Sequence, residues 1–143
     1  MADYYTNFSV VIPLPDERAQ EHALHIARSG SQARFADDLP PDFPDELRDS
    51  VEDWSFDAEP DDEDGRPALW LHSESGGMDS AGEFIRYLLK RFTPEEHVAM
   101  EWSHDCSRPC VDAFGGGAAY ITAEEIHSFS TSLWLAQQRA EQP

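Results

Sequence analysis

The sequence predicts a small α+β domain, in which helices pack on one face of a mostly antiparallel sheet, related to the ferredoxin-like arrangement. Three observations predict it. Apolar residues alternate with polar ones in several short segments, they recur at helical spacing in others, and the segments follow the order β-α-β-β-α-β-β-α. A length of 143 residues suits one domain, residues 1–143, without an internal repeat.

The first predicted strand covers residues 4–14, because Phe8, Val10 and Ile12 would point to one face while Asn7 and Ser9 point to the other. A helix follows it. Pro15 and Asp16 suit the first turn of that helix, since proline lacks only an N–H that the first turn does not use, and a carboxylate favours the positive end of the helix dipole. Gly30 is expected to mark where the helix ends.

Residues 36–67 form an acidic, proline-punctuated insertion. Between positions 36 and 64 there are fourteen acidic residues and one basic residue, Arg48, so this part holds thirteen of the nineteen excess negative charges. A short helix is expected over residues 45–53 and a short strand over 54–56. The run EPDDEDG that follows has no apolar residue to anchor it, so a mobile loop is expected there.

Another strand is expected over residues 68–73. Ser80 and Glu83 match a capping box, which predicts a helix with its apolar stripe at Phe84, Ile85, Leu88 and Leu89. The next strand is expected over residues 98–103.

A loop and a strand over residues 118–122 are expected next. Thr122 and Glu125 suggest a second capping box, and the helix it opens would face inward with Ile126, Phe129, Leu133 and Trp134.

The composition excludes several functions. A net charge of −19 opposes direct binding to nucleic acid or to an anionic membrane, because both depend on lysine and arginine. No run of apolar residues reaches the roughly 18 that a membrane span needs, and Met1–Asn7 does not resemble a signal peptide. The two cysteines are too few for a disulfide framework and fit a reducing compartment, so a cytoplasmic protein is expected.

The predicted binding surface is a stripe of carboxylates. Five acids within nine residues of helix would place one charge per roughly 2.5–3 Å, against one per about 1.7 Å of B-DNA. Such a surface can compete for a basic groove of a nucleic-acid-binding protein. The alternative is a solvated acidic face that only serves solubility. The candidate residues are the helical Asp45, Glu46, Asp49, Glu52 and Asp53, with Asp61, Asp62, Glu63 and Asp64 as a mobile electrostatic extension.

Other chemistries find less support. The glycine at position 65 sets the register of a calcium loop that would begin at Pro60 and end at Leu71, and neither residue is a ligand. His104, Cys106 and Cys110 supply at most three local zinc ligands, and whether the cysteines bind metal or form a disulfide stays open.

The glycine turn SESGGMDS lacks a phosphate-binding motif. His22 and His25 lie three apart on the first helix and are too few to make a metal site. No cofactor is expected.

The stretch LWLHSESGGMDSAGEFIRYLLKRF and the later EWSHDCSRPCVDAFGGGAAYITAEEI resemble a group of small acidic uncharacterised α+β proteins of bacterial plasmids, phages and integrated elements. The resemblance covers residues 68–127 and supplies no functional residues. It implies a mobile-element context, in which acidic proteins often act as nucleic-acid mimics against host defence.

The sequence therefore predicts a non-enzymatic binding protein that occupies a basic surface of a nucleic-acid-handling partner, as a DNA mimic that inhibits bacterial CRISPR or restriction machinery. Two alternatives stay open. One is a small metal-dependent enzyme or metal-binding protein that uses His104, Cys106 and Cys110, and the other is a structural module of a larger assembly. The oligomeric state is left undetermined.

Overall fold

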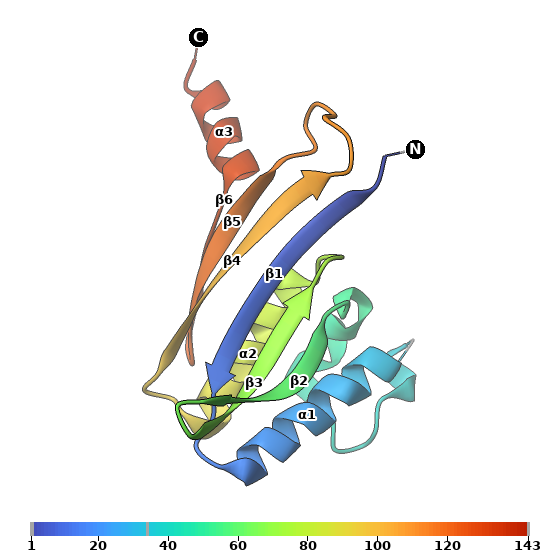
Figure 1. Ribbon diagram of the computed structural model, residues 1–143, viewed down its shortest axis with the longest axis vertical. Helices are drawn as coiled ribbons and strands as arrows, with labels where there is room; N and C mark the ends of the chain where they lie inside the picture. Colours follow the sequence, from blue (N-terminus) through green and yellow to red (C-terminus); the bar gives the residue numbers. More distant parts are fainter. Residues whose placement is uncertain (1, 34, 143) are drawn as a thin grey trace.

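Six strands form one antiparallel sheet in the order β2-β3-β1-β4-β5-β6 (Figure 1). The computed structural model describes residues 2–33 and 35–142, so Met1, Arg34 and Pro143 of the predicted domain lie outside the described residues. The strands are β1 Tyr4–Pro13, β2 Asp57–Glu63, β3 Arg66–Ser73, β4 His97–Cys106, β5 Gly115–Thr122 and β6 Ile126–Ser130. The helices are α1 Glu17–Gln32, α2 Met78–Phe92 and α3 Thr131–Ala140, with two 3-10 helices, η1 Ala36–Asp38 and η2 Asp45–Asp53.

The first six long elements run β1-α1-β2-β3-α2-β4, and β1 lies in the sheet between β3 and β4. This arrangement confirms the predicted α+β class and its ferredoxin-like relation. The strands β5 and β6 extend the sheet beyond β4. Within the described residues, no helix has both the length and the apolar composition needed to cross a membrane.

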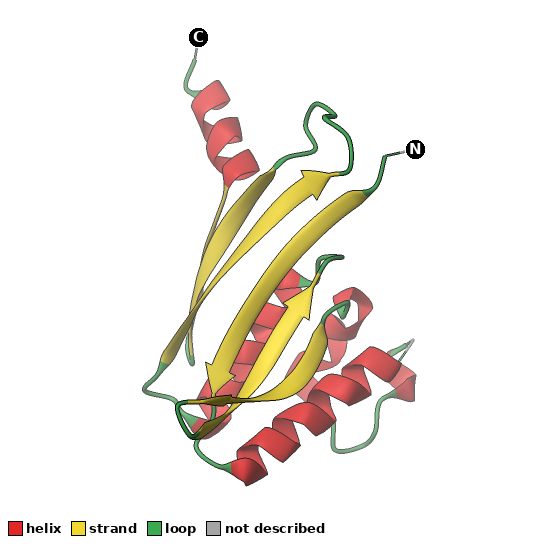
Figure 2. Ribbon diagram, viewed as in Figure 1, coloured by secondary structure: helices red, strands yellow, loops and turns green. Residues whose placement is uncertain are grey.

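Helices α1 and α2 pack on the same face of the sheet (Figure 2). They also touch each other, since the His22 ring nitrogen Nε2 lies 2.8 Å from the hydroxyl oxygen of Tyr87. The core between helices and sheet contains Ile12, Leu69 and Phe84, all fully buried. Burying such a side chain contributes about 1.5–3 kcal/mol, so the alternation read from residues 8–12 is the pattern that this core requires. Neither α1 nor α2 lies on the opposite face of the sheet.

The acidic insertion is anchored by aromatic side chains. Trp54 lies below η2 with its ring centroid 4.8 Å from that of Phe56 and 5.4 Å from that of Phe84. Its indole N–H donates to the backbone oxygen of Ala27 at 3.1 Å. The Trp54 ring also occupies the space beside Gly30, where a β-carbon would lie 2.4 Å from it. Gly30 therefore lies inside α1, which continues to Gln32, and does not end the helix as predicted.

The run EPDDEDG, residues 59–65, was predicted to be a mobile loop, but most of it lies in strand β2. Residues 54–56 were predicted to be a short strand, but they belong to no strand. β2 pairs along its whole length with β3, from Asp57 opposite His72 to Glu63 opposite Arg66. The prediction was wrong because the backbone hydrogen bonds of a strand depend on a neighbour that local composition does not reveal. The sharp turn that follows uses a positive φ at Asp64 and Gly65.

The helix predicted to begin at residue 122 is also wrong in part. Thr122 Oγ1 accepts from the backbone N–H of Glu125 at 3.0 Å, but the chain then turns into β6 instead of a helix. Helix α3 begins at Thr131 and is capped by Ser130, whose Oγ accepts from the Leu133 N–H. Of the four residues predicted to face inward, Ile126 packs against the core, while Phe129, Leu133 and Trp134 are exposed.

Smaller differences concern the ends of elements. Asp16 caps α1 from outside the helix, and its side chain accepts from the Ala19 N–H at 2.9 Å. Ser80 does not cap α2, which begins at Met78; its hydroxyl donates instead to the Ser50 backbone oxygen at 2.6 Å. β4 continues through Cys106 because its last residues pair with the start of β1.

Candidate functional site

The acidic residues of η2 form a row along its exposed side. A 3-10 helix has three residues per turn and rises about 2.0 Å per residue, so residues three apart lie in line about 6 Å apart. Glu46, Asp49 and Glu52 have this spacing and are all exposed, whereas Leu47 and Val51 are buried. We call these three acids the η2 row.

The structure corrects the stripe expected from α-helical spacing. The nine residues of η2 form a 3-10 helix, which is longer per residue than an α-helix and so spreads the like charges further apart. Asp45 and Asp53 fall outside the η2 row. Asp45 accepts from Arg48 Nε at 3.0 Å, and Asp53 accepts from the Ser80 hydroxyl at 3.4 Å.

Few cations neutralise the η2 row. Glu46 lies 3.7 Å from the Nζ atom of Lys90. Asp49 and Glu52 are exposed and have no hydrogen-bond or ion-pair partner within residues 2–33 and 35–142. Their charges are therefore directed to solvent.

A second row lies along β2. The register places Asp57, Glu59 and Asp61 on the side of β3 that carries Trp70 and His72, which is the face without α1 and α2. Alternate residues of a strand are about 6.6 Å apart. With Glu63 at the end of the strand these exposed acids form what we call the β2 row: Asp57, Glu59, Asp61 and Glu63. The Glu59 carboxylate is hydrogen-bonded, since its Oε2 lies 2.9 Å from His72 Nε2.

Asp57 and Glu59 were not among the predicted site residues. The signal that could have found them is the alternation of acids with Ala58 and Pro60. Of the predicted residues, Asp62 and Asp64 belong to neither row. The Asp62 carboxylate accepts from the Gly65 N–H at 2.7 Å, and Asp64 sits in the turn with a φ of 53°.

The two rows are close in the chain and are held by regular structure. Only three residues separate the end of η2 from the start of β2, and two of them, Trp54 and Phe56, are buried. Seven exposed carboxylates thus lie on two ordered elements that follow each other in the chain: Glu46, Asp49, Glu52, Asp57, Glu59, Asp61 and Glu63.

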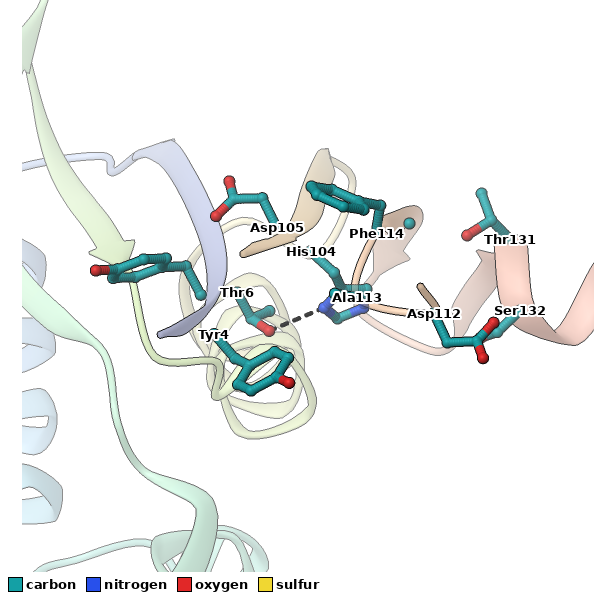
Figure 3. Close-up of a pocket in the computed structure, with 11 residues that line it drawn as sticks. Tyr4, Thr6, His104, Asp105, Asp112, Ala113, Phe114, Thr131 and Ser132 are labelled. Carbon is teal, nitrogen blue, oxygen red and sulfur yellow. Dashed lines mark hydrogen bonds between the residues drawn. The ribbon is translucent and has the colours of Figure 1, made fainter. Parts of the chain in front are cut away.

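A pocket of about 270 Å³ lies where β1 begins and β4 ends, beside the start of α3 (Figure 3). It contains the hydroxyl of Thr6, which lies 2.8 Å from Nδ1 of His104, together with Tyr4 and Asp112. The pocket is wide open to solvent. The hydrogen bond to Thr6 orients the imidazole.

The cysteines do not join His104 in a metal centre. The described residues contain no group of three or more His, Cys, Asp or Glu side chains placed to hold a metal ion. Cys106 and Cys110 are free thiols, and the hydrogen bond that the Cys110 thiol donates to Cys106 raises the pKa of Cys110. A raised pKa keeps the thiol protonated near neutral pH, which makes it a poor nucleophile.

The other candidate motifs are explained by local packing. A β-carbon at Gly77, in the glycine turn, would lie 2.9 Å from the hydroxyl of Ser55, so the turn packs against the end of η2. His22 and His25 bond to different partners, Tyr87 and Asp42 respectively.

Comparisons with known proteins leave the family undefined. No family model matches the chain, and no curated protein matches it. A solved structure to which it is similar is LarC2, the C-terminal domain of a cyclometallase involved in the synthesis of the NPN cofactor of lactate racemase, in its apo form. The sequence identity is 10%, the TM-score is 0.33, and the match covers 100% of this chain and 90% of that chain. A TM-score this low carries no functional argument.

Proposed function

We propose that this chain is a non-enzymatic, cytoplasmic binding protein whose η2 and β2 rows occupy a basic groove of a nucleic-acid-handling protein, such as a CRISPR or restriction complex. The observation that supports it is the placement of seven exposed carboxylates at regular spacing on ordered elements. The partner's groove would be lined with lysine and arginine side chains that normally neutralise phosphates.

The spacing is compatible with such a groove. Neighbouring carboxylates in the rows are about 6–7 Å apart, and phosphates of one DNA strand are about 3.4 Å apart along the helix axis. The linear charge density is therefore within a factor of about two of one DNA strand. Because the carboxylates sit on a helix and a paired strand, little conformational entropy is lost when they bind.

The electrostatic character predicts the kinetics. Opposite charges steer the encounter, so association is fast at low salt and slows as ions screen the attraction. If these acids served only solubility, which is the alternative function, the protein would show no saturable binding to a partner.

The test is a competition assay with purified restriction endonucleases and CRISPR effector complexes, each bound to labelled duplex DNA. The test variant neutralises five carboxylates of the rows that form no ion pair within the described residues: Asp49→Asn, Glu52→Gln, Asp57→Asn, Asp61→Asn and Glu63→Gln. The matched control removes five exposed charges elsewhere: Glu17→Gln, Glu21→Gln, Glu95→Gln, Glu124→Gln and Glu141→Gln.

We expect the native chain to displace DNA from a partner, and the row variant to need at least about tenfold more protein. The control variant, with the same net charge, should change the required concentration by less than about threefold. Equal losses in both variants would show that total charge and not the rows causes binding. Displacement of DNA from none of the partners would contradict the proposed partner class.

A further inference from the structure

The C-terminal helix α3 lacks the contacts that a short helix needs. All ten of its residues are described, and none is buried. Leu133, Trp134 and Leu135 are 57%, 46% and 44% exposed, and three consecutive residues cover more than one side of a helix. An isolated helix shorter than about 12–15 residues is marginal in water, so α3 requires a surface to pack against.

The neighbouring strands β5 and β6 contact α3 but leave all of its described residues unburied. α3 extends beyond the end of the sheet, away from α1 and α2 (Figure 1). Two hydrogen bonds hold its first turn: Ser130 Oγ accepts from the Leu133 N–H at 3.3 Å, and Thr131 Oγ1 accepts from the Gly116 N–H at 3.0 Å. Phe129, just before the helix, is 51% exposed.

The strand that leads into α3 is an open sheet edge. Natural sheets protect their edges with charged side chains or proline, because unpaired backbone groups recruit other strands. The edge strand β2 has both, five carboxylates and Pro60. The other edge, β6, reads IHSFS and has neither, so it is free to pair with another strand.

The charge distribution allows a second copy of this chain to be the occupant. Residues 126–142 contain one arginine and one glutamate and have no net formal charge, while residues 36–64 carry a net −13. Five strand spacings of about 4.8 Å separate β2 from β6, roughly 24 Å, which exceeds the screening length of about 8–10 Å at physiological salt. A second copy of this chain can therefore approach β6 without bringing the two β2 rows together.

We infer that β6 and α3 form the interface of a homodimer, in which the β6 strands of two copies pair antiparallel about a two-fold axis. This joins the two six-stranded sheets into one continuous sheet. It also places the start of each α3 beside the Ile126 end of the other copy's β6, where Leu133, Trp134 and Leu135 become buried. The inference does not depend on the proposed function, since β6 and α3 contain no residue of the acidic rows.

The experiment measures the mass of the full chain by light scattering after size-exclusion chromatography, at several protein concentrations. A dimer has twice the chain mass of 16.1 kDa. The test variant is Leu133→Lys with Leu135→Lys, and a second test variant is Phe129→Lys. The matched control is Val111→Lys, at an apolar side chain that is 89% exposed but lies outside β6 and α3.

We expect a dimer for the native chain and for Val111→Lys, and a monomer for both test variants, with far-UV circular dichroism showing an intact fold. The amides of β6 should also exchange more slowly with deuterium in the native chain than in Phe129→Lys. A native chain that is monomeric at every concentration would overturn the inference. So would a dimer that persists in both test variants.

Discussion

Replacing Gly30 by alanine should change stability in the opposite direction to the same substitution at an ordinary helical glycine. A β-carbon there would lie 2.4 Å from the Trp54 ring atom Cε2, and the ring cannot move freely because its N–H donates to Ala27. Although alanine in place of glycine normally stabilises a helix by about 1 kcal/mol, we expect Gly30→Ala to destabilise this protein by about 1–3 kcal/mol. Chemical denaturation would measure the change in the free energy of unfolding.

A matched control exists in α2. A β-carbon at Gly82 would lie 3.7 Å from Ile126 Cδ1 and 4.0 Å from Ile121 Cδ1, which are ordinary contacts. Gly82→Ala should therefore leave stability unchanged or raise it by up to about 1 kcal/mol. If both substitutions shift stability in the same direction, the close approach of Trp54 to α1 is wrong.

His22 couples stability to pH. Burial, followed by the nearby Arg91 and His25, lowers the pKa of His22 below its ordinary 6.5. The unfolded chain then binds more protons than the folded one between the two pKa values, so stability falls as pH decreases through that interval. We expect the free energy of unfolding to fall as pH decreases below about 6.5, and His22→Gln to reduce this slope. An identical slope in the variant would contradict the role assigned to His22.

At the scale of elements, the ion pair between Arg66 and Glu96 links three segments that lie far apart in the sequence. Arg66, at the start of β3, bonds both oxygens of Glu96 at 3.0 and 2.9 Å and donates from Nε to the Leu14 backbone oxygen at 2.9 Å. The hydrogen bond from Arg66 holds the pKa of Glu96 below its usual value. The contribution of this pair to stability is therefore present above the ordinary carboxyl pKa and is lost as pH falls through the lowered one.

We expect Glu96→Gln to cost about 1 kcal/mol of unfolding free energy at neutral pH, a modest value because both side chains are more than a third exposed. Denaturation at neutral pH and at a pH below the carboxyl range measures it, and the difference from the native chain should vanish in acid. Glu95→Gln removes the same charge one residue away without the paired hydrogen bonds. If the two variants lose the same free energy of unfolding, then the negative charge in general, and not the contact between Arg66 and Glu96, accounts for the stabilisation.

At the scale of the whole molecule, the net charge of −19 should oppose folding. Added salt screens the repulsion between like charges, so we expect the melting temperature to rise between low and high sodium chloride. The variant with five neutralised carboxylates in the rows should have a higher melting temperature than the native chain at low salt, which corresponds to about 1–2 kcal/mol of added stability. Its melting temperature should also change less with salt. Thermal denaturation followed by circular dichroism measures both.

The variant that removes five charges outside the rows separates two explanations. If the repulsion is concentrated in the η2 and β2 rows, this control should be stabilised less than the row variant. Equal stabilisation would mean that the charges act only through their sum.

Much of the fold could be predicted from local pattern. The alternation that places Phe8, Val10 and Ile12 on one face and the apolar stripe that contains Phe84 and Leu88 each reflect a single buried face, and the structure buries these five residues. The predictions that were wrong concern segments whose state depends on a distant neighbour. β2 is a strand because β3 pairs with it, and β6 is a strand because β5 does, although both sequences lack a strong strand signal.

The candidate site divides in the same way. The sequence by itself determined that the acids concentrate in residues 36–64, because charge is a property of composition. Only the tertiary structure decided which of them form rows. The 3-10 geometry of η2 aligns Glu46 with Asp49 and Glu52, and pairing with β3 turns Asp57 and Glu59 to the face without helices, since the direction of a side chain depends on backbone geometry and on the neighbour that pairs with it.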